Sequence, residues 1–226
     1  MVRWMPEGSM VGGQCMDLER FGKSLEDISH LLSHLHGEIA NLESHYSKAL
    51  LVLRQLKTDA GTDELTGVLR RGAFFERLQK LLGECTLARE GFGILLIDLD
   101  HFKRINDTHG HLTGDEVLSR IGKLLKKFET PHCFSGRFGG EEFIVAQRGT
   151  DAELLMTAEM IRRNAEQLSG RSLVGEWKCT VSIGVATARL NGTDVGSQND
   201  VPRLLKDADD ALYEAKRKGR NQVKVA

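Results

Sequence analysis

Apolar residues recur along residues 17–58 at alternating spacings of three and four. The series is Leu18, Phe21, Leu25, Ile28, Leu32, Leu35, Ile39, Leu42, Tyr46, Ala49, Leu53 and Leu56. This spacing places the apolar side chains on one seam of a helix and predicts a coiled coil. Because Leu31, Leu50 and Val52 widen the stripe, a four-helix arrangement or a helix docked on the rest of the chain is the alternative. We favour a parallel stalk that forms a homodimer through this N-terminal helix.

The composition favours a soluble, cytoplasmic protein. The chain has 31 Lys and Arg against 32 Asp and Glu, so its net charge of −1 gives no reason to expect nucleic acid or an anionic membrane as a partner. The four cysteines form no Cys-x-x-Cys pair, which indicates free thiols in a reducing compartment. No apolar run approaches the ~20 residues that span a bilayer. The length leaves room for one ordinary domain after the helix.

Two short segments flank the predicted stalk. Residues 1–16 are rich in Gly and Met and lack the continuous apolar core of a signal peptide, so we expect a disordered leader or an expression remnant. Residues 59–62 contain Gly61, and with Thr58 they predict a break in the helix that joins it to the following domain.

A paired glycine followed by two acids stands in the second half of the chain, in the stretch Arg137–Phe143. Gly139 and Gly140 supply the backbone angles of a two-residue hairpin loop and let a ligand approach the main chain. Glu141 and Glu142 then display adjacent carboxylates beside open amides, which suits a metal-bound phosphate. The alternative is a solvated hairpin without a ligand.

A second acidic segment lies upstream of this hairpin. The unbroken apolar run Ile94–Ile97 is typical of a strand buried on both faces. Asp98 ends the run, and Asp100 points the same way because strand side chains alternate. A carboxylate there is costly to bury unless it is paired or binds metal. A solvated strand end is the alternative, but together with Glu141 the two segments predict a carboxylate cluster for a divalent cation.

Segments in a fixed order give the chain a family resemblance. They are Asp63–Gly67, Asp98–Asp107, Gly110–Asp115, Gly139–Phe143, Val181–Ala186 and Ala208–Asn221. With them, residues 63–226 resemble the GGDEF family of diguanylate cyclases. The resemblance implies that two GTP are condensed into cyclic di-GMP and two pyrophosphates. It also implies Mg²⁺ or Mn²⁺, two ions per active site, and a complex of two domains, each holding one GTP.

The order of predicted elements after Asp63 is that of an α+β protein. We expect helices near 74–82, 115–128, 151–168 and 202–217, strands at 92–98, 132–138, 143–147 and 177–187, and a short last strand. Such an alternation fits a ferredoxin-like palm, a mixed central sheet with packed helices, and the resemblance implies the same fold. The polar stretch Arg189–Asp200 is predicted to be a surface loop.

The resemblance assigns metal and proton chemistry to the acids. Asp98 and Glu141 match the metal-binding carboxylates, and the Leu99 carbonyl is implied as a further ligand. Glu142 matches the other acid of the signature, which either binds metal or helps to remove the 3′ proton.

Two positions match the pair that binds guanine in the family, namely Asn106 and Asp115. A carboxylate accepts hydrogen bonds from guanine N1–H and N2–H₂, which adenine does not present in that arrangement, so Asp115 favours GTP. From the residues alone, Thr113 and Glu116 form a helix capping box, and the alternative for Asp115 is an acid that compensates the helix dipole.

The resemblance places four further residues on the terminal phosphates of GTP. These are Phe102, through the backbone that follows it, and the side chains of Lys103, Lys216 and Arg220. The amides of Gly139 and Gly140 are implied to bind the substrate as well. Cations four residues apart near a helix C-terminus are favourable without a ligand, which is the alternative for Lys216 and Arg220. Arg162 and Arg163 are predicted to lie on a solvated face.

The chain departs from the family pattern at two places. Thr130–Cys133 stands where product-inhibited members carry Arg-x-x-Asp, so we expect that inhibitory site to be absent. Arg70 replaces the usual asparagine after Leu-Thr-Gly, which puts a contact at the domain entrance in doubt. Two other functions remain as alternatives: an inactive sensor of GTP or cyclic di-GMP, and a cyclase that makes a mixed cyclic dinucleotide.

Overall fold

The computed structural model describes residues 12–188 and 200–226, with side chains described for 22–48, 61–188 and 201–226. The chain divides into two compact units, one ending at Thr58 and the other beginning at Asp59. We describe each unit by itself.

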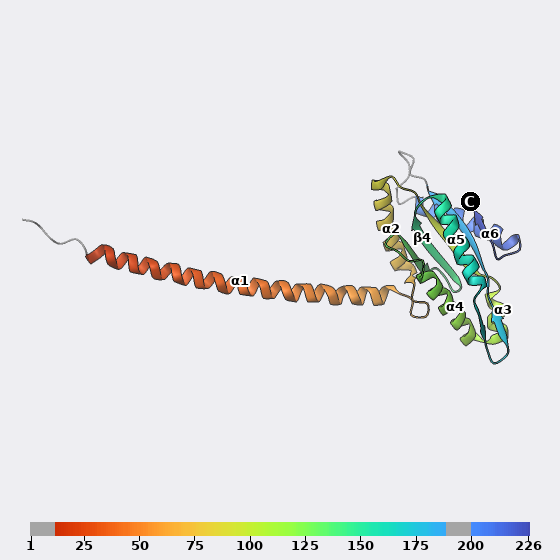
Figure 1. Cartoon of the computed structure of the whole chain (residues 1–226), viewed down its shortest axis with the longest axis horizontal. Coiled ribbons are helices and arrows are strands. Elements are labelled where there is room, and N and C mark those ends of the chain that lie inside the picture. Colours follow the sequence, from red (N-terminus) through yellow and green to blue (C-terminus); the bar gives the residue numbers. More distant parts are fainter. Residues whose placement is uncertain (1–11, 189–199) are drawn as a thin grey trace, which may run out of the picture. The chain divides into compact units, whose positions relative to one another are not determined.

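One long helix, α1, runs from Gly12 to Gly61, and all but its last three residues belong to the first unit (Figure 1). The predicted helix is confirmed. Its predicted start is wrong, whereas its end at Gly61 lies inside the predicted joint 59–62. Residues 12–16 are helical and not disordered, and Gln14 and Met16 are good helix formers; residues 1–11 lie outside the described part. The helix continues past Thr58 because neither glycine nor proline occurs between Thr58 and Gly61. It ends at Gly61, and glycine is the residue at which helices commonly end.

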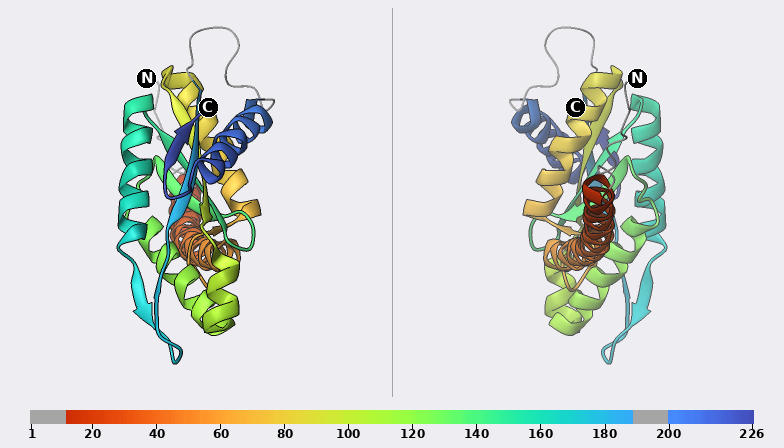
Figure 2. Two further views of the ribbon diagram at one scale, coloured as in Figure 1. Left: turned by 90° about the vertical axis from the view of Figure 1, so that its right-hand side faces the viewer. Right: turned by 90° about the vertical axis from the view of Figure 1, so that its left-hand side faces the viewer.

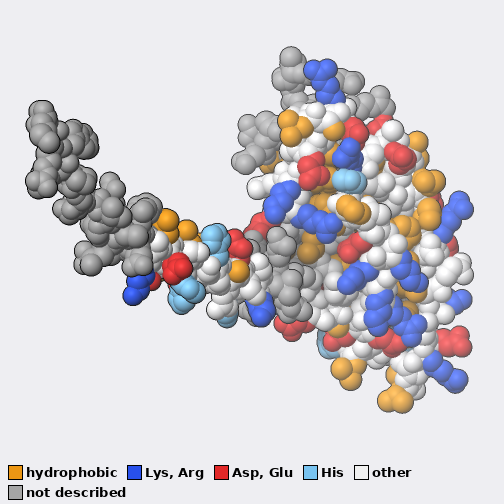
Figure 3. Space-filling model, turned by 60° about the vertical axis from the view of Figure 1, so that its left-hand side comes forward, with side chains coloured by type: hydrophobic (Ala, Val, Ile, Leu, Met, Phe, Trp, Pro, Cys, Tyr) orange, Lys and Arg blue, Asp and Glu red, His pale blue; other side chains and the backbone are white. Residues whose placement is uncertain are grey.

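The described part of the apolar stripe on α1 is exposed in the single chain (Figure 3). Its seam members between residues 22 and 48 are Leu25, Ile28, Leu32, Leu35, Ile39, Leu42 and Tyr46, with exposed fractions from 44% at Leu35 to 75% at Leu42. A helix that is exposed along such a stripe gains stability when a second apolar surface covers it.

The second unit alternates strands and helices. They are β1 (Leu69–Arg70), α2 (Arg71–Ala88), β2 (Phe92–Leu99), α3 (Phe102–His109), α4 (His111–Lys126), β3 (Cys133–Arg137), β4 (Glu142–Arg148), α5 (Asp151–Glu166), β5 (Ser169–Arg171), β6 (Glu176–Lys178), β7 (Val181–Ala188), α6 (Asp200–Arg217) and β8 (Val223–Val225).

The strands that the structure describes form a six-stranded mixed sheet in the order β1-β3-β4-β2-β7-β8, and β5 and β6 form a separate hairpin. The two outer pairs, β1 with β3 and β7 with β8, are parallel, and the inner pairs are antiparallel. The inner order β3-β4-β2-β7, with α4 and α5 on one face, is that of a ferredoxin-like fold, so the predicted fold class is confirmed.

Helices cover both faces of this sheet (Figure 2). Side chains of β2 alternate between two clusters: Leu95 and Ile97 pack with α4 and α5, whereas Ile94 and Leu96 pack with α2 and α6. Every residue of β2 is therefore buried, which explains its unbroken apolar run. Asp98 is even-numbered like Ile94 and Leu96, so its side chain lies on the face of the sheet that α6 covers.

The predicted strand 177–187 is divided in the structure. Its first residues form β6, which pairs with β5, and the chain re-enters the main sheet only at Val181. Trp177 anchors the hairpin because its ring packs on Gly170, where a side chain would clash. The alternation of buried residues continues across Cys179 and Thr180, so periodicity does not reveal the break. The predicted loop Arg189–Asp200 falls outside the described residues except for Asp200, which begins α6.

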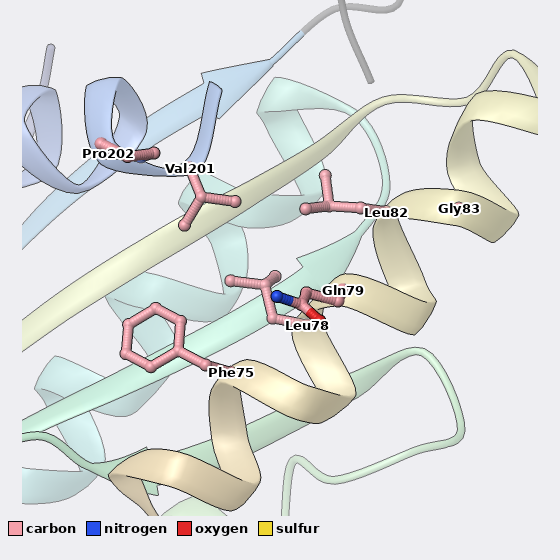
Figure 4. Close-up of a pocket in the computed structure, with 7 residues that line it drawn as sticks. All are labelled: Phe75, Leu78, Gln79, Leu82, Gly83, Val201 and Pro202. Carbon is pink, nitrogen blue, oxygen red and sulfur yellow. The ribbon is translucent and has the colours of Figure 1, made fainter. Parts of the chain in front are cut away.

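Three further observations concern the described residues. Cys85, Cys133 and Cys179 are buried free thiols, as predicted. No helix there is both long and apolar enough to cross a bilayer. A cavity of about 380 Å³ lies between α2 and the start of α6, bordered by Phe75, Leu78, Gln79, Leu82, Gly83, Val201 and Pro202 (Figure 4). None of the predicted site residues lines it.

Candidate active site

Asp98 occupies the end of the central strand β2, where the sheet brings three strands together. In the sheet register, Asp98 lies directly opposite Glu142 on β4 and Ser182 on β7. Directly opposed residues of antiparallel strands share a face, so the Asp98 and Glu142 side chains lie on the same side of the sheet. Lys216 from the last turn of α6 reaches Asp98, with 2.8 Å between Nζ and Oδ2. The Asp98 side chain is only 9% exposed.

The glycine pair lies in the turn between β3 and β4, as predicted. The prediction of a two-residue loop with unusual glycine angles is wrong, because residues 138–141 separate the strands and neither Gly139 nor Gly140 has a positive φ. The Phe138 amide donates to the Glu142 carbonyl at 2.8 Å and closes the hairpin. The Leu99 amide donates to the Glu141 carbonyl at 3.4 Å, which ties the turn to the end of β2. The carboxylate of Glu142 lies so close to Gly139 that an added Cβ would be 2.5 Å from Oε2. That oxygen is the end of a flexible side chain that can move aside, so the contact brings Glu142 close to the Gly139 backbone without requiring glycine there.

Electrostatic repulsion links the acids of this region. Burial raises the pKa of Asp98, and the neighbouring Asp100 raises it further, against the lowering effects of Lys216 and Arg220. Burial and the Asp98 charge raise the pKa of Glu141 in the same way. Both carboxylates are thus costly to ionise, and a bound cation would remove that cost.

Asp98 should make the folded protein less stable as the pH rises. A raised pKa means that the folded state holds the proton more tightly than the unfolded chain, so stability falls from the usual aspartate pKa of 3.8 through the raised value. We expect the free energy of unfolding of Asp98→Asn, relative to wild type, to increase between pH 3 and pH 7 in metal-free buffer. Urea denaturation at both pH values measures this, with the exposed Asp210→Asn as control. A difference that does not change with pH would contradict the assignment.

The carboxylates fit a divalent ion that shares its ligands with a phosphate. In the described part of the chain, no three His, Cys, Asp or Glu side chains gather closely enough to hold an ion by themselves. Mg²⁺ commonly takes one or two carboxylates and completes its octahedron with substrate phosphates and water. Asp98 and Glu141 supply that number of carboxylates. Leu99 lies beside them at the end of β2, and its role as a ligand stays a prediction.

The predicted guanine-binding residues lie on two adjacent helices, Asn106 on α3 and Asp115 on α4. The Asn106 amide packs against Gly114, where any side chain would collide with its Oδ1, so Asn106 lies next to the residue that precedes Asp115. Asp115 is exposed and Asn106 is half-buried. The helices thus present both polar side chains close together.

The predicted capping box at Thr113 is wrong. Helix α4 begins at His111, so Thr113 lies inside it, and its hydroxyl donates to the His109 carbonyl at 2.9 Å. The start is earlier because α3 ends at His109, and the φ of 83° at the following Gly110 turns the chain directly into the next helix. Asp115 consequently lies in the second turn, where compensation of the helix dipole is weaker.

The cationic residues come from the ends of two helices. Phe102 is the first residue of α3 and anchors it in the core, and Lys103 beside it is exposed. The first amides to donate within this helix are those of Arg104 and Ile105, which bond to the His101 carbonyl. The backbone amides of Phe102 and Lys103 come before them and so belong to the helix N-terminus, which favours anions. At the other helix, Lys216 contacts Asp98 and Arg220 lies near enough to lower its pKa.

Asp100, which the sequence placed only on the same side as Asp98, has a structural role. Its side chain accepts hydrogen bonds from the hydroxyls of Thr180 at 2.7 Å and Ser182 at 2.6 Å. It also accepts from the backbone amide of Asn221 at 3.0 Å. Both oxygens are thereby engaged, and Asp100 joins β2, β7 and the turn after α6.

Arg137 is a site residue to which the sequence assigned no role. It donates to the Gly140 carbonyl at 2.7 Å and to both oxygens of Asp63 at 3.1 and 3.2 Å. It thus connects the glycine turn to the start of the domain. Its place two residues before the first signature glycine was the available signal. Arg70, the unusual residue at the entrance, donates to the Thr62 carbonyl and to Glu64.

The stretch Thr130–Cys133 presents no arginine or aspartate of its own. Arg77 donates to the carbonyls of Thr130 and Pro131. Burial raises the pKa of Cys133 to about 11, so its thiol is neutral. The absence of the product-inhibition site stays a prediction.

Comparison with known proteins agrees with this geometry. Residues 60–222 match the family model described as diguanylate cyclase, GGDEF domain. The chain belongs to the GGDEF family. The probable diguanylate cyclase DgcT of Escherichia coli K12 is 37% identical over 176 residues, which are 76% of this chain and 37% of that protein. This GGDEF chain therefore spans less than half the length of that curated relative.

Solved structures resemble the chain over most of its length. The coiled coil and GGDEF domain of DgcB from Caulobacter crescentus, in complex with c-di-GMP, gives a TM-score of 0.71 at 30% identity and covers 85% of this chain and 99% of that one. Diguanylate cyclase SiaD from Pseudomonas aeruginosa, in complex with its activator SiaC, gives 0.77 at 28% identity and covers 95% and 80%.

Proposed function

We propose that this GGDEF protein is a diguanylate cyclase that condenses two GTP into cyclic di-GMP and two pyrophosphates, with Mg²⁺ or Mn²⁺. The observation that carries the proposal is the meeting of Asp98, the Gly139–Glu142 turn and Lys216 at one end of the sheet. The signature acids, the positively charged side chain of Lys216 and the glycine backbone are all present there. An inactive sensor would not need the whole set.

Each residue has a task in this reaction. Asn106 and Asp115 bind guanine, while the start of α3, Lys103, Lys216 and Arg220 hold the terminal phosphates. Asp98 and Glu141, with the Leu99 carbonyl, would hold two ions, which offset charge on the triphosphate and polarise the α-phosphate. Glu142 completes this set either as a ligand or as the acceptor of the 3′ proton.

The covalent step joins two substrates that two domains bring together. The 3′-oxygen of each GTP forms a bond to the α-phosphorus of the other, the bond to the β-phosphate oxygen breaks, and pyrophosphate leaves. One proton is lost from each attacking hydroxyl. Because one domain offers one such site, the active complex needs two domains face to face.

A product assay tests the function and the nucleotide. Protein is incubated with Mg²⁺ and GTP, with and without ATP, and products are resolved by chromatography and mass. We expect cyclic di-GMP in both samples. A mixed product in the ATP sample would overturn the assignment of Asp115. No product, despite a confirmed dimer and measurable GTP binding, would favour the sensor.

The exposed stripe of α1 gives the protein a means of pairing its domains. We propose that two copies of α1 associate in parallel and that this tether raises the effective concentration of the second domain. The 51% exposure of Leu32 in the single chain leaves this seam residue available to a partner helix.

Replacing Leu32 with glutamate should weaken the dimer by about 100-fold, because an unpaired charge is costly to bury. Specific activity should fall most at low enzyme concentration. Sedimentation and a dilution series measure both effects, and Ser33→Glu, on the neighbouring position outside the seam, is the matched control. Equal specific activity of Leu32→Glu at all dilutions would refute the role of the stalk.

A further inference from the structure

The turn that carries Arg220 has an unfavourable backbone. Gly219, Arg220 and Asn221 are consecutive residues with positive φ, at 115°, 64° and 44°. Glycine adopts such angles freely, but a side chain with a Cβ is strained there, arginine more than asparagine. Strained residues persist only where their surroundings hold them. The turn therefore needs external contacts to keep Arg220 in place.

Helix α5 supplies these contacts through the side chain of Asn221. Arg162 donates from Nη1 to Asn221 Oδ1 at 2.8 Å, and Asn221 Nδ2 donates to Glu166 Oε1 at 2.8 Å. Arg162 closes the ring by donating from the same nitrogen to Glu166 Oε2 at 3.1 Å. On the other side, the Asn221 amide donates to Asp100. Asn221 is thus held from two directions.

Arg162 is unlike its neighbour on the same helix. Its side chain is 15% exposed and its Nε also donates to Glu159 at 3.0 Å, whereas the Arg163 side chain is 74% exposed. The prediction that both arginines are solvated is wrong for Arg162. Three fixed partners leave its guanidinium one orientation, which is a geometry suited to positioning another residue.

We propose that Arg162 is a positioning residue: through Asn221 it fixes the backbone at Arg220 and so aims that guanidinium at the terminal phosphates of GTP. This inference rests on the proposed function, which assigns Arg220 to those phosphates. Arg162 itself lies on α5 and acts only through the turn. Without its hydrogen bond, Arg220 relaxes toward an ordinary backbone conformation and the phosphate contact is lost.

The test compares Arg162→Ala with the adjacent Arg163→Ala. Binding is measured by calorimetry with Mg²⁺ and 3′-deoxy-GTP, which lacks the attacking hydroxyl, and with GMP, which lacks the terminal phosphates. We expect Arg162→Ala to weaken 3′-deoxy-GTP by between about tenfold and 100-fold, as for a misplaced binding group, and to leave GMP unchanged. Arg163→Ala should match wild type for both, and Arg162→Lys should recover part of the loss.

A double-mutant cycle separates positioning from general stability. In the Arg220→Ala background, Arg162→Ala should have no further effect on 3′-deoxy-GTP, because the group it positions is gone. Additive losses, or equal losses for 3′-deoxy-GTP and GMP, would overturn the inference. If wild type binds 3′-deoxy-GTP no more tightly than GMP, the phosphate site of the proposed function fails instead. Since neither probe is turned over, this result is independent of catalysis.

Discussion

Glu141→Ala should abolish formation of cyclic di-GMP, with a loss of about 1,000-fold or more. The carboxylate lies in the turn near Asp98, and under the proposed function its removal takes away one of the two acidic ligands for the ions. That loss corresponds to about 4 kcal/mol of transition-state stabilisation, within the range that metal ions supply. The measurement is the initial rate of product formation at saturating Mg²⁺ and GTP.

Stability measurements distinguish this result from unfolding. Because burial and Asp98 raise the pKa of Glu141, its charge is unfavourable in the folded protein without metal. The alanine variant should therefore unfold at the same urea concentration as wild type or a higher one at pH 7. Glu176→Ala, at an exposed position on β6, is the matched control and should keep full activity. Activity retained by Glu141→Ala would rule out its role as a ligand.

The fold could be predicted because its signals are local. The apolar run of β2, the glycine turn and the stripe of α1 each follow from residues close in sequence. Boundaries were less certain where two elements meet without a polar loop, as at Gly110 between α3 and α4. The separation of β6 from β7 was hidden because burial alternates across it, and only pairing with β5 divides the strand.

The site was predicted in part for the same reason. Asp98 and the Gly139–Glu142 turn carry their own signals, and β2 and β4 bring them together. The partners that hold the site lie far away in sequence, as with Arg137 and Asp63, and Arg162 and Asn221. The sequence Arg162-Arg163 does not indicate which of the two arginines will be covered by a turn that lies almost 60 residues further along the chain.

Asp100→Ala should cause the largest loss of stability among the site variants. Asp100 is 5% exposed, and its side chain accepts three hydrogen bonds, from Thr180, Ser182 and Asn221. Each buried donor left without an acceptor costs about 1–3 kcal/mol, so we expect a total of roughly 3–5 kcal/mol after some water enters. Asp100→Asn keeps one acceptor oxygen and should lose less. Urea denaturation ranks the three proteins.

The cost of Asp100→Ala comes from the donors it strands, and a second substitution can show this. The Ser182 hydroxyl is fully buried, so in the wild-type background Ser182→Ala should destabilise the protein by about 1 kcal/mol. In the Asp100→Ala background the same change removes an unpaired hydroxyl and should be neutral or stabilising. Equal losses in both backgrounds would mean that Ser182 does not depend on Asp100. Coupling between them would place the end of β2, β7 and the turn bearing Arg220 in one hydrogen-bonded unit.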